Sequence, residues 1–145
     1  RIPVSKIDNV INFINNSNIS LPLYSSKVPA GFPSPADDHM EGKLDLNTHL
    51  IKHPTATFFV KASGESMLGA GIHDGDILVV DRSLEPRKGR VVIAAVDGQL
   101  TVKRLQKKGS KTFLVPENKK FRSIELSENN DVMIWGVVTN VIHKV

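Results

Sequence analysis

The sequence of 145 residues contains no cysteine, few aromatic residues and no long apolar run. The absence of cysteine excludes disulfides, thiol catalysis and cysteine-ligated metals, and fits a reducing compartment. No apolar run approaches the roughly 20 residues of a membrane-spanning helix. Residues 1–23 mix asparagine, serine and charged side chains throughout, unlike a secretory leader. We therefore expect no membrane partner, and no motif indicates a cofactor or a metal site.

Aromatic residues make up only 6% of the chain, although its net charge is +4. The densest basic clusters cover residues 103–111 and 117–122. Nucleic-acid binding would require a basic surface with stacking residues, and no stacking surface is evident. We interpret both clusters as solvated strand ends and loops, and we expect no sequence-specific DNA binding.

The N-terminal part of the chain differs in amino-acid composition from the rest. The apolar spacing in residues 5–17 predicts a short amphipathic helix. Residues 18–38 hold four prolines and four serines and predict an extended arm without regular structure. Residues 44–53 predict a second short helix, which Pro54 ends.

From Ala56 onward the chain is rich in β-branched and aromatic residues in short runs, which predicts a mostly-β domain. The Asp97-Gly98 pair predicts a tight hairpin. We expect a flexible N-terminal arm over 1–40 and a compact β domain over 41–145. The expected strands cover residues 56–63, 76–82, 90–97, 100–106, 112–117 and 132–143.

Ser66 stands in a glycine-rich loop between the first two of these strands. The glycines, at positions 64, 69, 71 and 75, have two interpretations. They can simply let the chain turn. They can also leave backbone N–H groups near Ser66 free to stabilise a developing oxyanion.

A nucleophilic serine needs a base, and the five histidines offer no obvious one. Only His73 shares the loop with Ser66, and none of the five has an acidic partner at an obvious orienting position. The pattern does not favour a Ser-His-Asp triad, which is defined by geometry rather than by sequence order.

Lys103 is the alternative base, because a neutral lysine can activate serine. On a two-faced strand Lys103 shares its face with Thr101 and Leu105. Burial would lower the pKa of its amine toward neutrality. The competing interpretation is an ordinary surface lysine beside Arg104.

Several motifs around these residues together resemble the LexA/UmuD family of self-cleaving proteins, over roughly residues 21–143. The resemblance implies twisted, partly open β sheets with a short helix, an extended arm and a Ser-Lys dyad. In order, the motifs are "PAGFPSPADD" (29–38), "DLNTHLIKHPTATFFVKASGESM" (45–67), "GIHDGDILVVD" (71–81) and "AAVDGQLTVKRL" (94–105).

The resemblance also implies roles for individual residues. Ser66 matches the nucleophile and Lys103 the general base. Ala30 and Gly31 match the scissile pair, and the backbone amides of Glu65 and Ser66 match the oxyanion hole. Met67 belongs to the motif, and we interpret it as a packing residue.

Within this family, the length before the cleavage site favours the UmuD-like group. Repressors carry a helix-turn-helix domain there, and the thirty residues before Gly31 are too few for one. The resemblance implies a cytoplasmic homodimer whose self-cleavage is stimulated by a RecA filament on single-stranded DNA. The shortened form would then serve a UmuC-like translesion polymerase in the SOS response, with the sliding clamp as a further candidate partner.

Three other functions compete with this one. The first is a self-cleaving LexA-like or phage-like repressor whose DNA-binding domain is missing from this chain; the sequence begins with arginine, not methionine. The second is a Ser-Lys signal peptidase, which needs a membrane anchor. The third is a binding module that has kept the fold without the activity.

Overall fold

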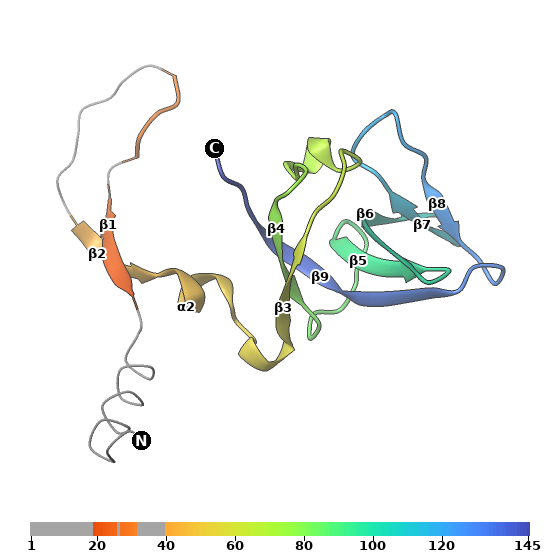
Figure 1. Cartoon of the computed structure of the whole chain (residues 1–145), viewed down its shortest axis with the longest axis horizontal. Coiled ribbons are helices and arrows are strands. Elements are labelled where there is room, and N and C mark those ends of the chain that lie inside the picture. The colour runs from red at the N-terminus through yellow and green to blue at the C-terminus, as the bar shows by residue number, and fades with distance from the viewer. Residues whose placement is uncertain (1–18, 26, 32–39) are drawn as a thin grey trace, which may run out of the picture. The chain divides into compact units, whose positions relative to one another are not determined.

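The computed structural model describes residues 19–25, 27–31 and 40–145 (Figure 1). The chain divides into two units, Arg1–His49 and Leu50–Val145, and each is described by itself. The helix expected over residues 5–17 lies outside the described residues. No helix in the described part of the chain has the length and apolar character needed to cross a membrane.

The first unit contains a two-stranded antiparallel sheet of β1 (Ser20–Tyr24) and β2 (Met40–Asp45). The prediction of no regular structure over 18–38 was therefore wrong for β1, and β2 was not predicted either, since its last two residues fall in the range expected to be helical. Local composition did not reveal β1, because pairing with a segment some twenty residues later forms it. Pro22 lies opposite Lys43 in the ladder, and a two-stranded sheet offers edge positions where proline is tolerated.

The short helix α2 (Leu46–Leu50) follows β2 directly and lies inside the predicted range of 44–53. It begins later than predicted because β2 continues through Asp45, whose side chain accepts a hydrogen bond of 3.0 Å from the Asn47 amide. Pro54 does not directly end α2. It begins the 3₁₀ turn η1 (Pro54–Ala56).

The larger unit is built on one antiparallel sheet of seven strands, in the order β3-β4-β9-β5-β6-β7-β8. This confirms the predicted mostly-β fold, and all six predicted strands are present with shifted ends. The three-residue strand β8 was not predicted. The strands are β3 (Thr57–Lys61), β4 (Ile77–Asp81), β5 (Val91–Val96), β6 (Gln99–Lys108), β7 (Lys111–Val115), β8 (Ile124–Leu126) and β9 (Val132–Ile142).

The hairpin predicted at Asp97-Gly98 is confirmed, since β5 and β6 pair across it. Both central residues have positive φ angles, 49° for Asp97 and 82° for Gly98. Two positive φ angles define the type I′ turn, whose twist matches that of the flanking strands.

Strand β9 holds the sheet together, because its first half pairs with β5 and its second half with β4. Val137 lies opposite both Asp81 and Val92 at the crossover. The adjacent Gly136 lies against β4: a Cβ there would be 2.7 Å from Val80 Cγ1 and 3.2 Å from the Asp81 carbonyl oxygen. Only glycine permits this approach.

Replacing Gly136 with alanine should therefore lower the free energy of unfolding by about 1–3 kcal/mol, because the added methyl overpacks a fully buried site. The urea midpoint, followed by circular dichroism, measures the loss. Gly42→Ala is the matched control, since a Cβ at Gly42 meets nothing within 4 Å. An unchanged midpoint for Gly136→Ala would contradict the account of β9.

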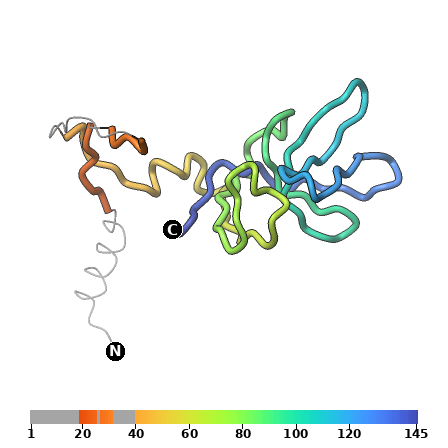
Figure 2. The backbone as a smooth tube through the Cα atoms, turned by 90° about the horizontal axis from the view of Figure 1, so that it is seen from above, coloured from red at the N-terminus to blue at the C-terminus, as the bar shows by residue number. Residues whose placement is uncertain are grey.

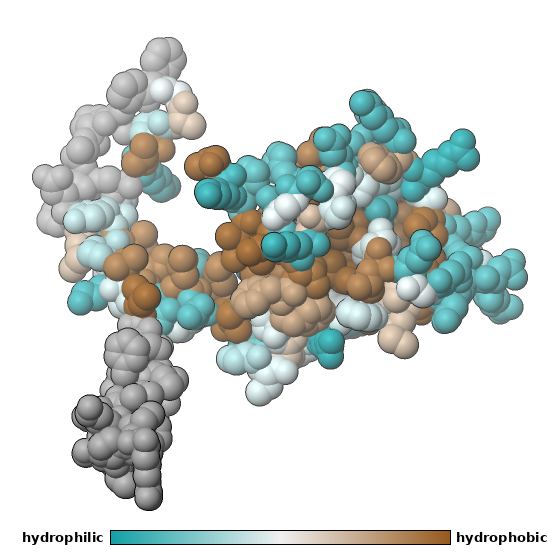
Figure 3. Space-filling model, in the orientation of Figure 1, coloured by the Kyte–Doolittle hydropathy of each residue, from teal (hydrophilic) through white to brown (hydrophobic). Residues whose placement is uncertain are grey.

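Two apolar clusters form the core of the larger unit. One gathers Met67, Leu78, Val80 and Ile93 around the strands that flank the Ser66 loop. The other includes Leu105, Leu114 and Val137. Apolar side chains also gather over the middle of this unit in the view of Figure 3, whereas polar side chains gather at its β7–β8 end. Figures 1 and 2 both place the C-terminus at the opposite end from β7 and β8.

Candidate active site

The loop between β3 and β4 presents Ser66, and its glycines serve two purposes. Gly64, Gly71 and Gly75 have φ angles of 85°, 80° and 86°, a region that side chains disfavour. Gly69 instead allows a close approach, because a Cβ there would lie 2.8 Å from the Glu117 carbonyl oxygen. The glycines therefore shape the loop and let it pack against the segment after β7.

The side chain of Met67 anchors this loop to the apolar core. Its side chain is only 2% exposed and belongs to the first apolar cluster, which confirms its interpretation as a packing residue. The 3₁₀ turn η2 (Leu68–Ala70) follows it and ends at the left-handed Gly71. A buried residue next to the serine fixes where the loop places Ser66.

Ser66 and Lys103 lie side by side, although 37 positions separate them in the sequence. The Lys103 Nζ is 3.1 Å from the Ser66 Oγ. Lys103 comes from β6 and is only 8% exposed, so it is not the surface lysine of the competing interpretation. Burial lowers the pKa of its amine, and among the described carboxylates none forms an ion pair with it.

The other hydrogen-bond partners of Lys103 determine how its amine would be oriented in the neutral form. Nζ lies 2.8 Å from the Thr101 Oγ1 and 3.1 Å from the Val102 carbonyl oxygen. A neutral amine has two N–H donors and one lone pair. If the donors go to these two oxygens, the lone pair faces the Ser66 hydroxyl, which can then donate its proton. This is the arrangement that general-base activation of a serine requires.

A cleft of about 230 Å³ opens beside this pair. Residues 60–63, at the end of β3, line one part of it, and residues 100–103 of β6 line another. Leu78 and Ile93 complete an apolar floor. The cleft thus offers an apolar surface next to a hydroxyl and a buried amine.

The segment after β7 holds the backbone on either side of the serine side chain. The Glu117 amide donates to the Ser66 carbonyl at 2.8 Å, and the Asn118 Nδ2 donates to the Glu65 carbonyl at 2.8 Å. Arg104 in turn binds the Glu117 carboxylate. The backbone N–H groups of Glu65 and Ser66 have no acceptor among the described residues, so both can donate to an oxyanion.

For the self-cleavage that the family resemblance implies, replacing Asn118 with alanine should slow the reaction roughly two- to tenfold, which corresponds to the loss of one hydrogen bond that positions the loop. The first-order rate of cleavage of the purified chain measures this. Lys119→Ala is the matched control, because Lys119 is exposed and adjacent. Equal rates for Asn118→Ala and the unmodified protein, with unchanged melting temperatures, would contradict a positioning role.

The histidines differ from the sequence interpretation, which found no acidic partners for them. His53 Nδ1 lies 2.6 Å from an Asp81 carboxylate oxygen, and His143 Nδ1 lies 2.6 Å from one of Asp76. The two members of these pairs are 28 and 67 positions apart, so no local sequence pattern indicated the contacts. His73 shares the Ser66 loop, and it forms an ion-pair contact of 3.7 Å with Asp76. Of the four histidines that the structure describes, none lines the cleft at Ser66, so the geometry gives no support for a Ser-His-Asp triad.

Ala30 and Gly31 belong to the first unit and lie in a bend outside any helix or strand. Both are exposed. A Cβ at Gly31 would meet nothing within 4 Å. The bond between them is therefore locally accessible, as a protease substrate must be.

Known proteins resemble this chain over most of its length. The family described as Peptidase S24-like matches residues 22–139. Protein SamA of Salmonella typhimurium is 49% identical over 85% of this chain and 85% of its own length. Protein ImpA of Escherichia coli is 49% identical over 85% and 83%, and Protein MucA of Escherichia coli is 44% identical over 83% of each. The chain belongs to the Peptidase S24-like family and is a UmuD-like serine autoprotease, of the class associated with SOS mutagenesis.

Proposed function

We propose that the chain cuts its own Ala30-Gly31 bond, with Ser66 as the nucleophile and Lys103 as the general base. The contact of 3.1 Å between Lys103 Nζ and Ser66 Oγ carries this proposal. Burial lowers the pKa of this amine, so its neutral form is more populated than in an exposed lysine. The apolar cleft beside it suits a small side chain such as that of Ala30.

The reaction follows from the geometry in two halves. Lys103 accepts the Ser66 proton as Oγ attacks the Ala30 carbonyl carbon, and the amides of Glu65 and Ser66 stabilise the oxyanion. The resulting ammonium gives its proton to the Gly31 nitrogen as the peptide bond breaks. Residues 1–30 then remain as an ester on Ser66. Lys103, neutral again, takes a proton from the water that attacks this ester, and it gives that proton to the Ser66 Oγ as the ester bond breaks.

The proposed division of the chain into an arm and a domain fits self-cleavage. The region 1–40 acts as an arm that carries the substrate bond, and the region 41–145 as the peptidase domain. The arm can serve the site of its own chain or that of a partner, because closing a loop of this length costs only about 3 kcal/mol. The proposal includes a cytoplasmic homodimer as the working form.

The partners come from the family resemblance. A RecA filament on single-stranded DNA would stimulate cleavage, and the processed dimer would join a UmuC-like translesion polymerase, with the sliding clamp as a further candidate. The repressor alternative gains no support from the relatives, since the match covers 83–85% of their own length. The remaining share is too short for a separate DNA-binding domain in those relatives.

Intact mass spectrometry after incubation at pH 7 and at about pH 10 tests the proposal. We expect two new species, residues 1–30 and 31–145, that are absent from Ser66→Ala protein. Cleavage at another bond would refute the assignment of Ala30 and Gly31. If nothing is cut even with RecA, nucleotide and single-stranded DNA, the proposed self-cleavage is wrong and a binding module is favoured.

A further inference from the structure

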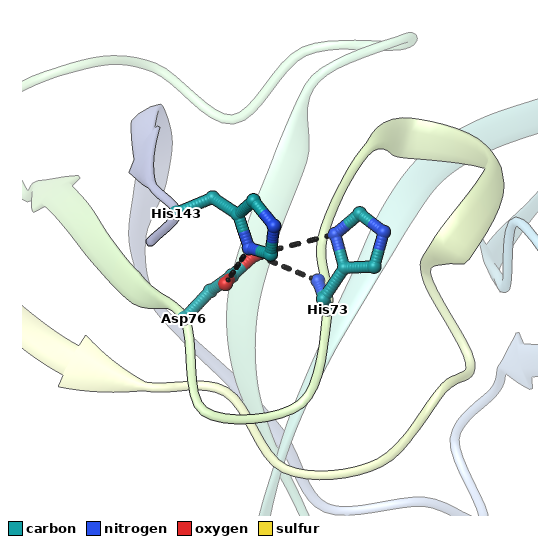
Figure 4. A group of neighbouring side chains, drawn as sticks. All are labelled: His73, Asp76 and His143. Carbon is teal, nitrogen blue, oxygen red and sulfur yellow. Dashed lines mark hydrogen bonds and ion pairs between the residues drawn. The ribbon is translucent and has the colours of Figure 1, made fainter. Parts of the chain in front are cut away.

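Three potential metal ligands lie together outside the cleft of Ser66 and Lys103: His73, Asp76 and His143 (Figure 4). One donor atom from each lies within 4.8 Å of the other two. Within the described ranges, no other trio of such side chains satisfies this condition. Sequence analysis could not detect the trio, because 67 positions separate Asp76 from His143.

Both imidazole rings face the same carboxylate. His143 Nδ1 is 2.6 Å from Asp76 Oδ1, and His73 Nδ1 is 3.7 Å from Asp76 Oδ2. The ring centroids of the two histidines are 4.4 Å apart. Asp76 itself is only 4% exposed, whereas both histidine side chains are partly open to solvent. The trio therefore combines a buried carboxylate with two imidazole rings that solvent can reach.

The Nδ1 atom of His73 faces Asp76 but is too far from it for a hydrogen bond. Its Nδ1 distance of 3.7 Å exceeds the hydrogen-bonding range, and its ring has no other hydrogen-bond partner among the residues described. Two ligands of a tetrahedral zinc ion lie about 3.3 Å apart, given bonds of about 2.0–2.1 Å to nitrogen and oxygen. The separations of 2.6 and 3.7 Å lie on either side of that value but involve different oxygens of Asp76. Since one ligand atom from each residue lies within 4.8 Å of the other two, the side chains would have to rotate toward one another to hold a single ion.

The donor set suits the same role. The Asp76 carboxylate also accepts a hydrogen bond of 2.7 Å from the His73 backbone amide, which holds the carboxylate in place. Two imidazoles and a carboxylate form a donor set typical of zinc sites that keep a position for water.

We infer that His73, Asp76 and His143 bind a divalent transition-metal ion, with zinc as the best match. Two ligands come from the loop that carries Ser66, and the third follows the end of β9. A bound ion would therefore cross-link this loop to the sheet. The expected consequence is a higher melting temperature in the presence of zinc.

The experiment uses full-length protein without a histidine tag, in the Ser66→Ala background so that the sample stays intact whether or not self-cleavage occurs. Isothermal titration with zinc gives stoichiometry and affinity, and cobalt(II) absorption reports the ligand geometry. His73→Ala and His143→Ala each remove one ligand from a partly exposed position. His53→Ala is the matched control, because it removes an equally short histidine–aspartate contact, of 2.6 Å, elsewhere in the same unit.

We expect one zinc ion per chain, cobalt bands typical of a tetrahedral site, and binding weakened at least about tenfold by either ligand variant. His53→Ala should bind as the parent does. Absence of binding by the parent would overturn the inference. So would a loss shared equally by His53→Ala, or full binding by both ligand variants, which would place the ion elsewhere.

Discussion

Ser66→Ala protein should show no self-cleavage under conditions that convert the unmodified chain completely. Loss of the nucleophile in a serine protease lowers the rate by roughly six orders of magnitude, and the described site offers no second hydroxyl in contact with Lys103 apart from that of Thr101. Intact mass spectrometry over a time course measures the rate. Because Ser66 lies on a loop and is only partly buried, the melting temperature should barely change.

Lys103→Met should abolish cleavage to the same extent while leaving the fold intact. Methionine fills a similar volume, and it removes an amine whose charged form burial disfavours. A melting temperature at least equal to that of the parent would show that loss of activity is not loss of folding. Substantial cleavage by either Ser66→Ala or Lys103→Met would show that the dyad is not the catalyst.

The cleavage rate of the unmodified protein should rise about tenfold per pH unit below the pKa of Lys103 and then level off. The sign follows from burial, which lowers this pKa because it disfavours the charged amine. The neutral base is therefore populated at a lower pH than in an ordinary lysine of pKa about 10.4. The break in the profile should accordingly lie below that value.

First-order rates between pH 6 and about pH 10, with circular dichroism at each pH to verify folding, test this dependence. Lys103→Arg serves as the control, because a guanidinium stays charged throughout the range and cannot act as the base. A flat rate from pH 7 to about pH 10 in folded protein would rule out a titrating lysine in the rate-limiting step.

Much of the fold follows from local sequence patterns. Runs such as Ile77–Asp81 and Val91–Val96 are rich in β-branched residues, and Asp97-Gly98 requires the backbone of a type I′ turn. The strands β1, β2 and β8 were not predicted: β1 contains a proline, β2 contains Gly42 and runs into a range expected to be helical, and β8 is only three residues long. Pairing with a neighbour, rather than local propensity, makes each of them a strand.

The site was predictable only in part, for a related reason. The proximity of Ser66 and Lys103 was expected from the family resemblance, since spacing alone cannot bring residues 37 positions apart together. No local pattern marked Asn118, which reaches back 53 positions to the Glu65 carbonyl. Likewise, the carboxylate partners of His53 and His143 come from distant strands or loops. Such contacts are properties of the folded sheet.

The place of β9 in the sheet also bears on when the chain can act during its synthesis. Ser66 lies between β3 and β4 and Lys103 on β6, and in the strand order only β9 joins β3-β4 to β5-β6. Ribosomes build β9 after every other strand described, and domains tend to fold as units. While β9 is still inside the ribosome, Ser66 and Lys103 would lie on two groups of strands, β3-β4 and β5-β6, that are not yet paired with each other through β9. If the proposed dyad is the catalyst, we therefore expect it to assemble only after β9 has emerged, and the arm to stay uncut while translation continues.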